Sequence, residues 1–421
     1  MLPITVFYFK LLFTFLAIPA VLFINFSPTF VSKIEFLWGQ KKTLIGFWFL
    51  YRIIPFVIIY IILDFEPRSD VPFFWYKASR AVKGGLVYVD FWSFHAPLYS
   101  YIIAFPLLFW YSPKAIVLFM VFMEGYIILK TYRFYQNFDV SIFKKTLLYL
   151  AIPAPLVMVI LGGQEDVWFW GIALLMLYYV KKYNDDGWKL GMIFSIGLIA
   201  IKATFIFWLF PLMLFIKNRI SFLLGMAIVG IPAVSILYLL TGWKFLELLE
   251  HIKVPLSPNL FTIFRPFITF LLGHLPSIPL FNWLGLIPTL LTALAVGYKF
   301  RENSIQKAIP YLFMGTYISM TIFQLSSPGY YSFCYLIPVV FFIIDWNSKK
   351  DVAIFMLLNA ILIIQPFIFT YLNSPNYDSF SDIISSPLRV VEYSLQVVNV
   401  VIFGWLLWRI LFTFSPRISY K

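Results

Sequence analysis

Residues 220–241, ISFLLGMAIVGIPAVSILYLLT, contain no charged side chain and are long enough to cross a bilayer as one helix. An α-helix rises about 1.5 Å per residue, so about twenty residues cross a hydrocarbon core of about 30 Å. About thirteen runs of this or nearly this length follow one another along the chain. They are 3–26, 43–63, 113–130, 147–162, 166–181, 189–201, 203–216, 220–241, 281–298, 308–324, 331–346, 352–371 and 394–412. They lack the short alternation of barrel strands, so the sequence predicts an all-α polytopic membrane protein with about thirteen transmembrane helices.

The composition indicates the same class. Of the 421 residues, 62% are hydrophobic and 12% are charged, and the mean hydropathy is +0.88. Soluble domains carry about 25% charged residues. The first 26 residues contain only one charge, Lys10, and lack a clear cleavage site, so we expect a retained helix and not a signal peptide. We treat residues 1–421 as a single membrane domain.

The net charge of +13 does not indicate nucleic-acid binding, because the basic residues lie in short loops between apolar runs. These loops all fall on one side, predicted to be cytoplasmic, if residues 97–111 and 259–273 do not cross. The loops hold Lys33, Lys41, Lys42, Lys130, Arg133, Lys144, Lys145, Lys181, Lys182, Lys189, Lys217, Arg219, Lys299, Arg301, Lys307, Lys349 and Lys350. We expect 97–111 and 259–273 to be interfacial or re-entrant helices on the outer face, where loops 64–112 and 242–280 would roof a cavity.

The cysteine and histidine residues indicate neither a disulfide framework nor a transition-metal site. Cys334 is the only cysteine, and the three histidines lie in separate segments without ligand spacing. We therefore expect no cofactor of this kind.

Two features inside the apolar region predict polar contacts within the membrane. The runs 189–201 and 203–216 are unusually short and meet at Lys202, and spans this short are a pointer to a binding site at a helix break. Arg52 and Glu124 fall near the middle of neighbouring predicted spans, where an unpaired charge is costly. We interpret these two as a structural ion pair.

The longest polar interruption in the first half of the chain is residues 69–97, SDVPFFWYKASRAVKGGLVYVDFWSFHAP. Three carboxylates lie just before it or at its start: Asp64, Glu66 and Asp70. A cationic stretch follows: Lys77, Arg80 and Lys83. An acid near the interface beside cations suits an enzyme that deprotonates a hydroxyl while holding a lipid phosphate. The alternative is an aspartate that caps a helix, with lysines that snorkel to water.

The order of residues in this loop resembles the GT-C superfamily of polytopic glycosyltransferases. The nearest branch is the polyprenyl-phosphate-mannose-dependent mannosyltransferases, which include the catalytic subunit of GPI mannosyltransferase I and its bacterial and archaeal relatives. The matching positions are Asp70, Tyr76, residues 78–81, Gly85, Tyr88, Ala96, Pro97 and Leu98. The chain departs from the family pattern at Ala96, where a proline is usual, and at Lys77, where an acid is common.

Three later stretches resemble the same family in the same order. They are GGQED at 162–166, IKATFIFWLFPLML at 201–214 and SSPGYYSFCYLIP at 326–338, with a fainter match in PNLFTIFRP at 258–266. The resemblance implies a GT-C type bundle whose catalytic module covers residues 43–346, with accessory helices in 347–421.

The resemblance also implies roles for particular residues. Asp70 would be the general base for the acceptor hydroxyl, which attacks C1 of a polyprenyl-phospho-sugar with inversion. A phosphate leaving group needs nearby cations. The first choice for the cation that stabilises the phosphate is Lys202, followed by Arg265 and then Arg80. Substrate hydroxyls would be bound by Gln164 and Asp166, with Tyr76 and Tyr330 also expected at the substrate.

Each of these assignments has a structural alternative. Asp166 would otherwise cap the following helix, Lys202 would snorkel at the outer face, and Tyr330 and Tyr331 would belong to an interfacial aromatic belt. A divalent-metal site built from acids near Asp70 is a further option. Family members with a lipid monophosphate donor are generally metal-independent, so we expect no metal.

Three functions remain open from the sequence. The first is an inverting hexosyltransferase, favouring mannose, that uses a polyprenyl-phosphate-linked donor and a lipid-linked glycan or glycolipid acceptor on the outer leaflet. The second is a transporter or flippase for a lipid-linked sugar, and the third is a non-catalytic subunit of a larger complex. We expect a multi-pass protein of a prokaryotic plasma membrane, in contact with membrane lipids, with its active site on the outer face.

Overall fold

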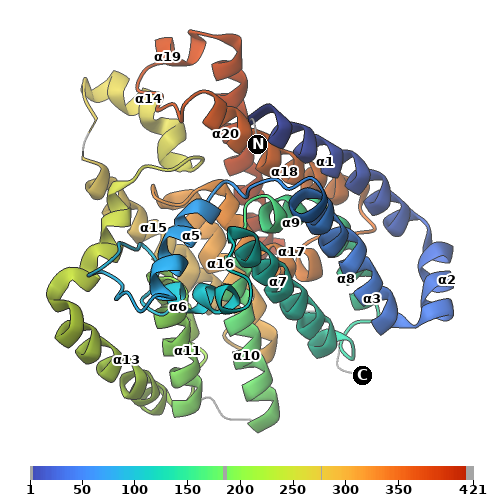
Figure 1. Ribbon diagram of the computed structural model, residues 1–421, viewed down its shortest axis with the longest axis horizontal. Helices are drawn as coiled ribbons and strands as arrows, with labels where there is room; N and C mark the ends of the chain where they lie inside the picture. Colours follow the sequence, from blue (N-terminus) through green and yellow to red (C-terminus); the bar gives the residue numbers. More distant parts are fainter. Residues whose placement is uncertain (1–2, 184–186, 276, 414–421) are drawn as a thin grey trace.

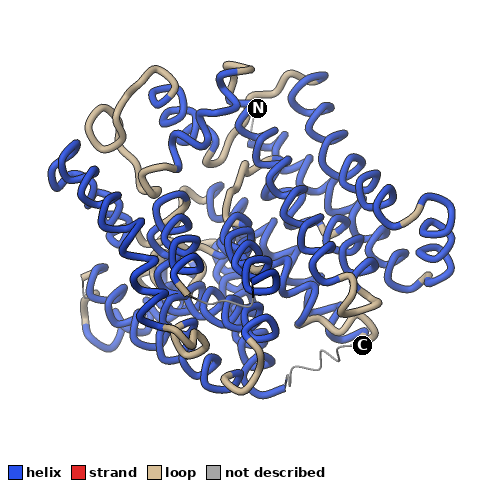
Figure 2. The backbone as a smooth tube through the Cα atoms, turned by 90° about the horizontal axis from the view of Figure 1, so that it is seen from below, coloured by secondary structure: helices blue, strands red, loops and turns tan. Residues whose placement is uncertain are grey.

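The computed structural model describes residues 3–183, 187–275 and 277–413. Over these residues the chain is helical, with no β-strand (Figure 2). The helices are α1 (Pro3–Phe26), α2 (Pro28–Trp38), α3 (Gln40–Trp48), α4 (Ile54–Phe56), α5 (Val71–Ala81), α6 (Tyr99–Ala104), α7 (Pro113–Tyr135), α8 (Ile142–Ala151), α9 (Pro153–Ile160), α10 (Val167–Tyr183), α11 (Trp188–Ala200), α12 (Leu209–Leu212), α13 (Arg219–Thr241), α14 (Leu260–Leu272), α15 (Ile278–Phe300), α16 (Ile305–Phe323), α17 (Leu336–Phe342), α18 (Lys349–Tyr371), α19 (Phe380–Ile384) and α20 (Pro387–Trp408). Tighter 3-10 segments run over Phe105–Leu108, Ala203–Trp208, Gly242–Lys253 and Gly329–Cys334, and wider π-helical turns over Phe49–Ile53, Val57–Ile62 and Arg409–Thr413.

Seven helices in the described ranges are long and apolar enough to cross a membrane. They are Tyr8–Phe26, Gln40–Ile62, Pro113–Tyr135, Arg219–Glu250, Pro279–Phe300, Lys349–Tyr371 and Pro387–Thr413. An eighth span is formed if α8 and α9, which meet at an angle of 55°, count as one. They break at Ile152, which is extended because it precedes Pro153. The helical membrane class is therefore confirmed, and the count of thirteen spans stays a prediction.

The two segments predicted not to cross are short helices. Tyr99–Leu108 covers the first, and α14 covers the second with 13 residues. The side chain of Asn259 accepts from the Thr262 amide at the start of α14, and Gly273, at φ 71°, ends the helix. At about 1.5 Å per residue neither helix reaches across about 30 Å of hydrocarbon. Their place on the outer face stays a prediction.

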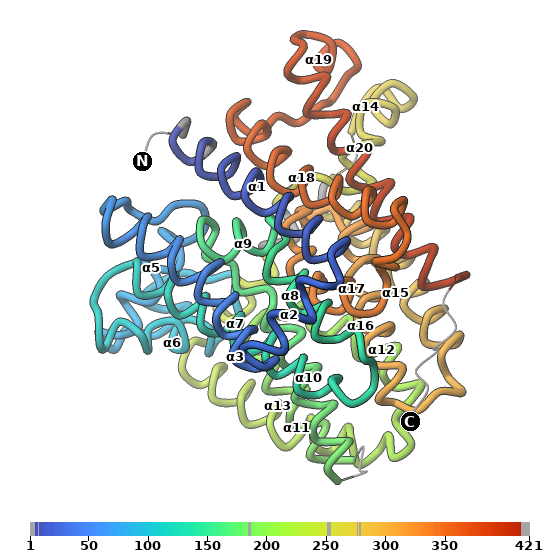
Figure 3. The backbone as a smooth tube through the Cα atoms, turned by 90° about the vertical axis from the view of Figure 1, so that its right-hand side faces the viewer, coloured from blue at the N-terminus to red at the C-terminus, as the bar shows by residue number. Residues whose placement is uncertain are grey.

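The interior of the molecule is built around α9, α10, α16 and α17. Every residue of α9 is buried, and this helix packs against α1, α7 and α18 (Figure 3). In contrast, α13 lies at the edge of the bundle (Figure 1), where only 11% of its apolar stretch is covered by protein. An apolar surface of this length needs lipid around it.

The predicted ion pair in the membrane region is present. Two guanidinium nitrogens of Arg52 donate to the two carboxylate oxygens of Glu124, each at 2.8 Å, and both side chains are fully buried. Arg52 also donates to the Leu150 carbonyl at 3.1 Å. Burial of either charge alone is costly, so each residue requires the other. The predicted pairing is confirmed, and the interpretation of the pair as structural stays a prediction.

Candidate functional site

A cavity of about 560 Å³ opens beside α5 and brings together residues that are far apart in the chain. Both predicted outer loops contribute to its lining. The first does so through α5, Trp92, Phe94 and His95, and the second through Leu248, Leu249, Val254 and Leu256. Its apolar lining residues include Phe207, Leu248, Leu249, Trp283 and Leu286. Its charged and titratable lining residues include Asp70, Lys77, His95, Glu165 and Lys202. The cavity therefore suits an amphipathic ligand that has both an apolar chain and a polar group.

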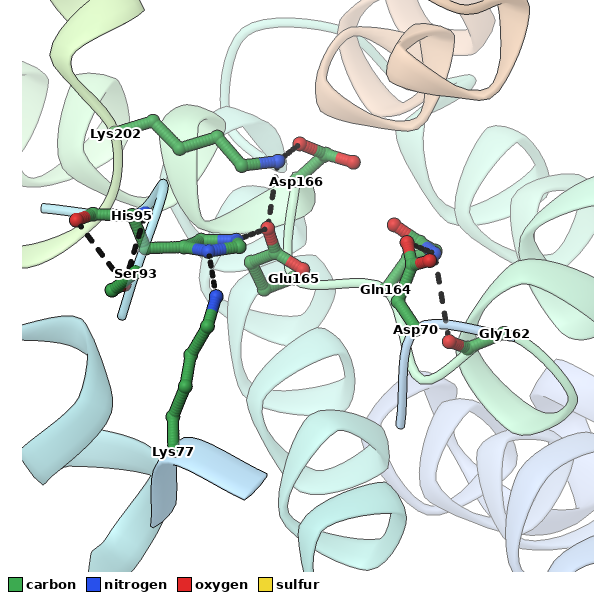
Figure 4. A network of polar contacts seen from close by, with 9 residues as sticks. All are labelled: Asp70, Lys77, Ser93, His95, Gly162, Gln164, Glu165, Asp166 and Lys202. Carbon is green, nitrogen blue, oxygen red and sulfur yellow. Dashed lines mark hydrogen bonds and ion pairs between the residues drawn. The ribbon is translucent and has the colours of Figure 1, made fainter. Parts of the chain in front are cut away.

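Asp70 directly precedes α5, but its side chain does not cap the helix. Its carboxylate instead accepts a hydrogen bond of 2.7 Å from the amide of Gln164 (Figure 4). The chain reaches this position through Gly163, whose φ is +61° and whose missing Cβ would lie 2.5 Å from a methyl group of Val71. The capping alternative for Asp70 is therefore wrong, and a glycine is required to hold Gln164 beside it.

Lys202 lies at the helix break that the sequence predicts. Helix α11 ends before it, Lys202 itself is extended, and the chain continues as a 3-10 segment. The free carbonyls at the end of α11 are satisfied from the first outer loop, because Ala96 donates to Ile201 and Leu98 donates to Ile199. These two backbone bonds hold His95 and its neighbours against the broken helix.

The side chain of Lys202 is 13% exposed, and its ammonium group lies among groups of the protein. It lies 2.7 Å from Glu165 Oε1 and 2.7 Å from Asp166 Oδ1, and 4.5 Å from the ring centre of Tyr331. Asp166 uses its Oδ1 in this contact, and its Oδ2 is buried without a partner. The described contacts of both side chains therefore favour a polar cluster over snorkelling for Lys202 and over helix capping for Asp166.

His95 connects this cluster to α5. The Lys77 ammonium lies 2.9 Å from His95 Nδ1, and His95 Nε2 lies 3.0 Å from Glu165 Oε1 (Figure 4). An ammonium group only donates, so Nδ1 accepts and the Nε2–H donates to the carboxylate. In the network, Lys77 donates to His95, His95 donates to Glu165, and Lys202 donates to both Glu165 and Asp166, with a neutral imidazole between Lys77 and Glu165.

Burial changes the protonation of these groups. It lowers the pKa of His95 to about 3, with the Lys77 charge adding to the effect, and it lowers the pKa of Lys77 to about 8. Burial also raises the pKa of Asp70, against the hydrogen bond from Gln164. For Glu165 burial is outweighed by Lys202 and the His95 N–H, which hold its pKa below the usual range. Asp70 is therefore a stronger base than an exposed aspartate.

Three buried acceptor oxygens in this region have no hydrogen-bond partner: Gln164 Oε1, Glu165 Oε2 and Asp166 Oδ2. A buried acceptor without a donor is costly, and the cost is removed when a ligand supplies hydroxyl groups. Of the three residues, Glu165 lines the cavity beside α5, so its Oε2 is the acceptor available to a hydroxyl group of a ligand bound there.

No protein-family model matches the chain, and no curated protein matches its sequence significantly. The chemistry of the site is therefore read from its own side chains.

The remaining predicted site residues lie in two places. Tyr330 lines the cavity with Tyr331. Tyr76 and Arg80 stack on each other on the exposed side of α5, with 3.7 Å between the guanidinium carbon and the ring centre, and they do not line the cavity. Arg265 does not line it either.

Arg265 is instead engaged near the C-terminal helices. It pairs with Asp378, in the segment before α19, and Figure 1 shows α14 and α19 together at one end of the molecule above α20. Its charge is therefore partnered by a carboxylate away from the Asp70 cavity.

The sequence does not predict the network that joins Lys77, His95 and Glu165. It predicts Lys77 only as part of a cationic stretch and as a departure from the family pattern. A signal was present in the spacing, because Lys77 lies on the same face of α5 as the buried Phe74, three residues before it. That face points into the protein, where a lysine requires a partner.

Among the described residues, no group of three or more histidine, cysteine or acidic side chains is arranged to hold a metal ion. The three carboxylates at the site are instead arranged around two ammonium groups and a histidine.

Proposed function

We propose that the protein is an inverting glycosyltransferase that moves a hexose, favouring mannose, from a polyprenyl-phosphate-linked donor to an acceptor hydroxyl. The observation that carries the proposal is the half-buried Asp70 carboxylate, which does not cap its helix and lines a cavity with apolar side chains and the unpartnered Oε2 of Glu165. A polyprenyl chain matches the apolar side chains, a sugar matches the polar ones, and a carboxylate of raised pKa matches a general base.

The reaction breaks one bond and forms one. Asp70 takes the proton of the acceptor hydroxyl as its oxygen bonds to C1 of the sugar. The bond from C1 to the phosphate oxygen breaks, and polyprenyl phosphate leaves with the electron pair. Lys77 stabilises the departing phosphate, because its ammonium contacts a neutral histidine and no carboxylate among the described residues. Lys202, which is held by two carboxylates, mainly orders Glu165 and Asp166.

The test is transfer of label from radioactive polyprenyl-phospho-mannose into a membrane lipid extract by the purified protein. We expect Asp70→Asn to lower the rate by at least about 10²-fold, because the amide keeps the shape but cannot take the proton. The matched control is Asp90→Asn, an exposed carboxylate of the same loop that does not line the cavity. Full activity of Asp70→Asn at equal protein levels would show that Asp70 is not the general base.

A lipid-linked sugar transporter is the second candidate, because the helix break at Lys202 lines the cavity. If neither wild type nor Asp70→Asn transfers label, a vesicle assay with the same lipid decides between the candidates. Movement of the lipid between leaflets by both proteins would favour transport over transfer.

A further inference from the structure

A second cavity, of about 120 Å³, is lined by Gln164, which does not line the cavity described above. Residues of α1, α9 and α18 contribute to its lining, and these three helices pack against one another (Figure 3). One water molecule needs about 10 to 15 Å³ on this scale, so the space accepts a group of several atoms. Both α1 and α18 lie outside residues 43–346, so helices outside the predicted catalytic module contribute to this cavity, although most of its lining comes from inside that range.

The second cavity adjoins the proposed base. Ser69, which precedes Asp70, lines it, and so does Gln164, which donates to the Asp70 carboxylate. Tyr330 lines both cavities. A group bound in the second cavity therefore lies beside residues that are directly linked to Asp70.

The polar groups of the second cavity define what it can bind. Lys10 and Arg68 line it and make no ion pair among the described residues, and Glu66 is the one carboxylate in the lining. Gln164 Oε1, with 4% of the residue exposed, is a buried acceptor without a donor. An ammonium group near a membrane span is costly without an anion, and an orphaned acceptor is costly without a donor. A ligand that carries both a phosphate and a hydroxyl satisfies both.

We propose that this second cavity binds the acceptor, and that the acceptor is a phosphate-bearing hydroxyl compound. This inference rests on the proposed function. Lys10 and Arg68 hold the phosphate, Gln164 Oε1 receives a hydroxyl hydrogen, and the reacting hydroxyl gives its proton to Asp70 as its oxygen bonds to C1 of the donor sugar.

The test is direct binding to the purified full chain in neutral detergent, which requires no donor and no turnover. Two probes separate the sources of the phosphate: phosphatidylglycerol, a lipid headgroup with free hydroxyls, and glycerol 3-phosphate, its soluble counterpart. Phosphatidylcholine is the neutral lipid control. We expect at least one anionic probe to bind and to raise the melting temperature, and its affinity to fall as salt is added.

The variants Lys10→Gln and Arg68→Gln should each weaken that binding by about tenfold or more, since each removes a charge-assisted hydrogen bond. The charge-keeping variants Lys10→Arg and Arg68→Lys should bind within a few-fold of wild type, which separates charge from folding. The matched control is Lys83→Gln, an exposed cation of the first outer loop that lines neither cavity.

The outcomes are distinguishable from those of the transfer test. Wild type that binds neither anionic probe, or binding that Lys10→Gln and Arg68→Gln leave unchanged, overturns the inference even if Asp70-dependent transfer is found. Charge-dependent binding supports the inference as a site for phosphate, and loss of Asp70-dependent transfer would then count only against the glycosyltransferase proposal.

Discussion

Lys77 is the residue at which the local pattern and the three-dimensional site differ most. The resemblance places an acid at this position, whereas the structure buries a lysine there against a neutral histidine. Because the His95 imidazole accepts from Lys77 and carries no charge, this contact does not offset the positive charge of the ammonium group, which stays available to an anionic ligand. The cation that best suits a phosphate is therefore one that sequence comparison treated as an exception.

The pH dependence of the reaction tests this role. Burial lowers the pKa of Lys77 to about 8, so the side chain is charged below that pH and neutral above it. We expect kcat/KM for transfer to fall above pH 8, and to fall on the acid side at a pH above the ordinary range of an aspartate, since burial raises the pKa of Asp70. Measurement of kcat/KM reports these groups in the free enzyme.

Substitution separates the contribution of Lys77 from other alkaline effects. Lys77→Arg stays charged and should move the alkaline limb to higher pH, whereas Lys77→Gln should lower kcat/KM by about 10²-fold across the range. Lys83→Arg, on the exposed end of the same segment, should leave the profile unchanged. An alkaline limb that stays near pH 8 in Lys77→Arg would assign it to another group.

At the scale of elements, the site is assembled by irregular backbone between helices. The break after α11, the turn at Gly163 and the loop before α6 each place a polar side chain that a continuous helix would not bring to the cavity. The carbonyl groups at the C-terminal end of α11 accept hydrogen bonds from backbone amides of the first outer loop, so the two elements depend on each other.

The turn at Gly163 provides the test at this scale. Gly163→Ala places a methyl group about 2.5 Å from Val71 in a backbone conformation with φ +61°, so we expect it to destabilise the fold by about 1 to 3 kcal/mol and to lower transfer through Asp70 and Gln164. The melting temperature and the transfer rate measure the two effects.

Gly84→Ala is the matched control for that variant. Gly84 also has a positive φ, of +85°, but nothing lies within 4 Å of its missing Cβ. It should show the backbone strain alone, with a smaller loss of stability and transfer close to wild type. Equal effects of the two substitutions would show that contact with Val71 is unimportant.

For the whole molecule, the arrangement of basic loops predicts which surface faces the cytoplasm. The cavity at Asp70 is bounded by the first outer loop, so the prediction places it on the opposite surface. The buried Cys334 is the only cysteine, which permits labelling at chosen positions after its replacement by serine.

We expect Lys83→Cys to react with a membrane-impermeant maleimide on intact cells. We expect Val140→Cys, in the loop just before Lys144 and Lys145 of α8, to react only after lysis. Both positions are exposed, with 97% exposure at Val140, so reactivity reports sidedness and not burial. Labelling of both positions from the same side would show that the predicted orientation is wrong.

The sequence by itself determined the helical membrane class, the break at Lys202 and the pairing of Arg52 with Glu124. These three follow from local features of the sequence. A long apolar run in water, unpaired backbone groups at a helix break and an unpaired charge at mid-membrane are each costly, so few structures accommodate them. The candidate site was predicted in part, through Asp70, Gln164, Asp166, Lys202 and Tyr330.

Only the tertiary structure decided which cations meet which carboxylates. Arg265 and Arg80 carry the same charge as Lys77, and nothing in a single sequence says that one pairs with Asp378, one stacks on Tyr76 and one reaches His95. The second cavity likewise requires α1 and α18 to meet over α9. Ion pairs and cavities depend on contacts between distant segments, which helix packing sets and local periodicity does not.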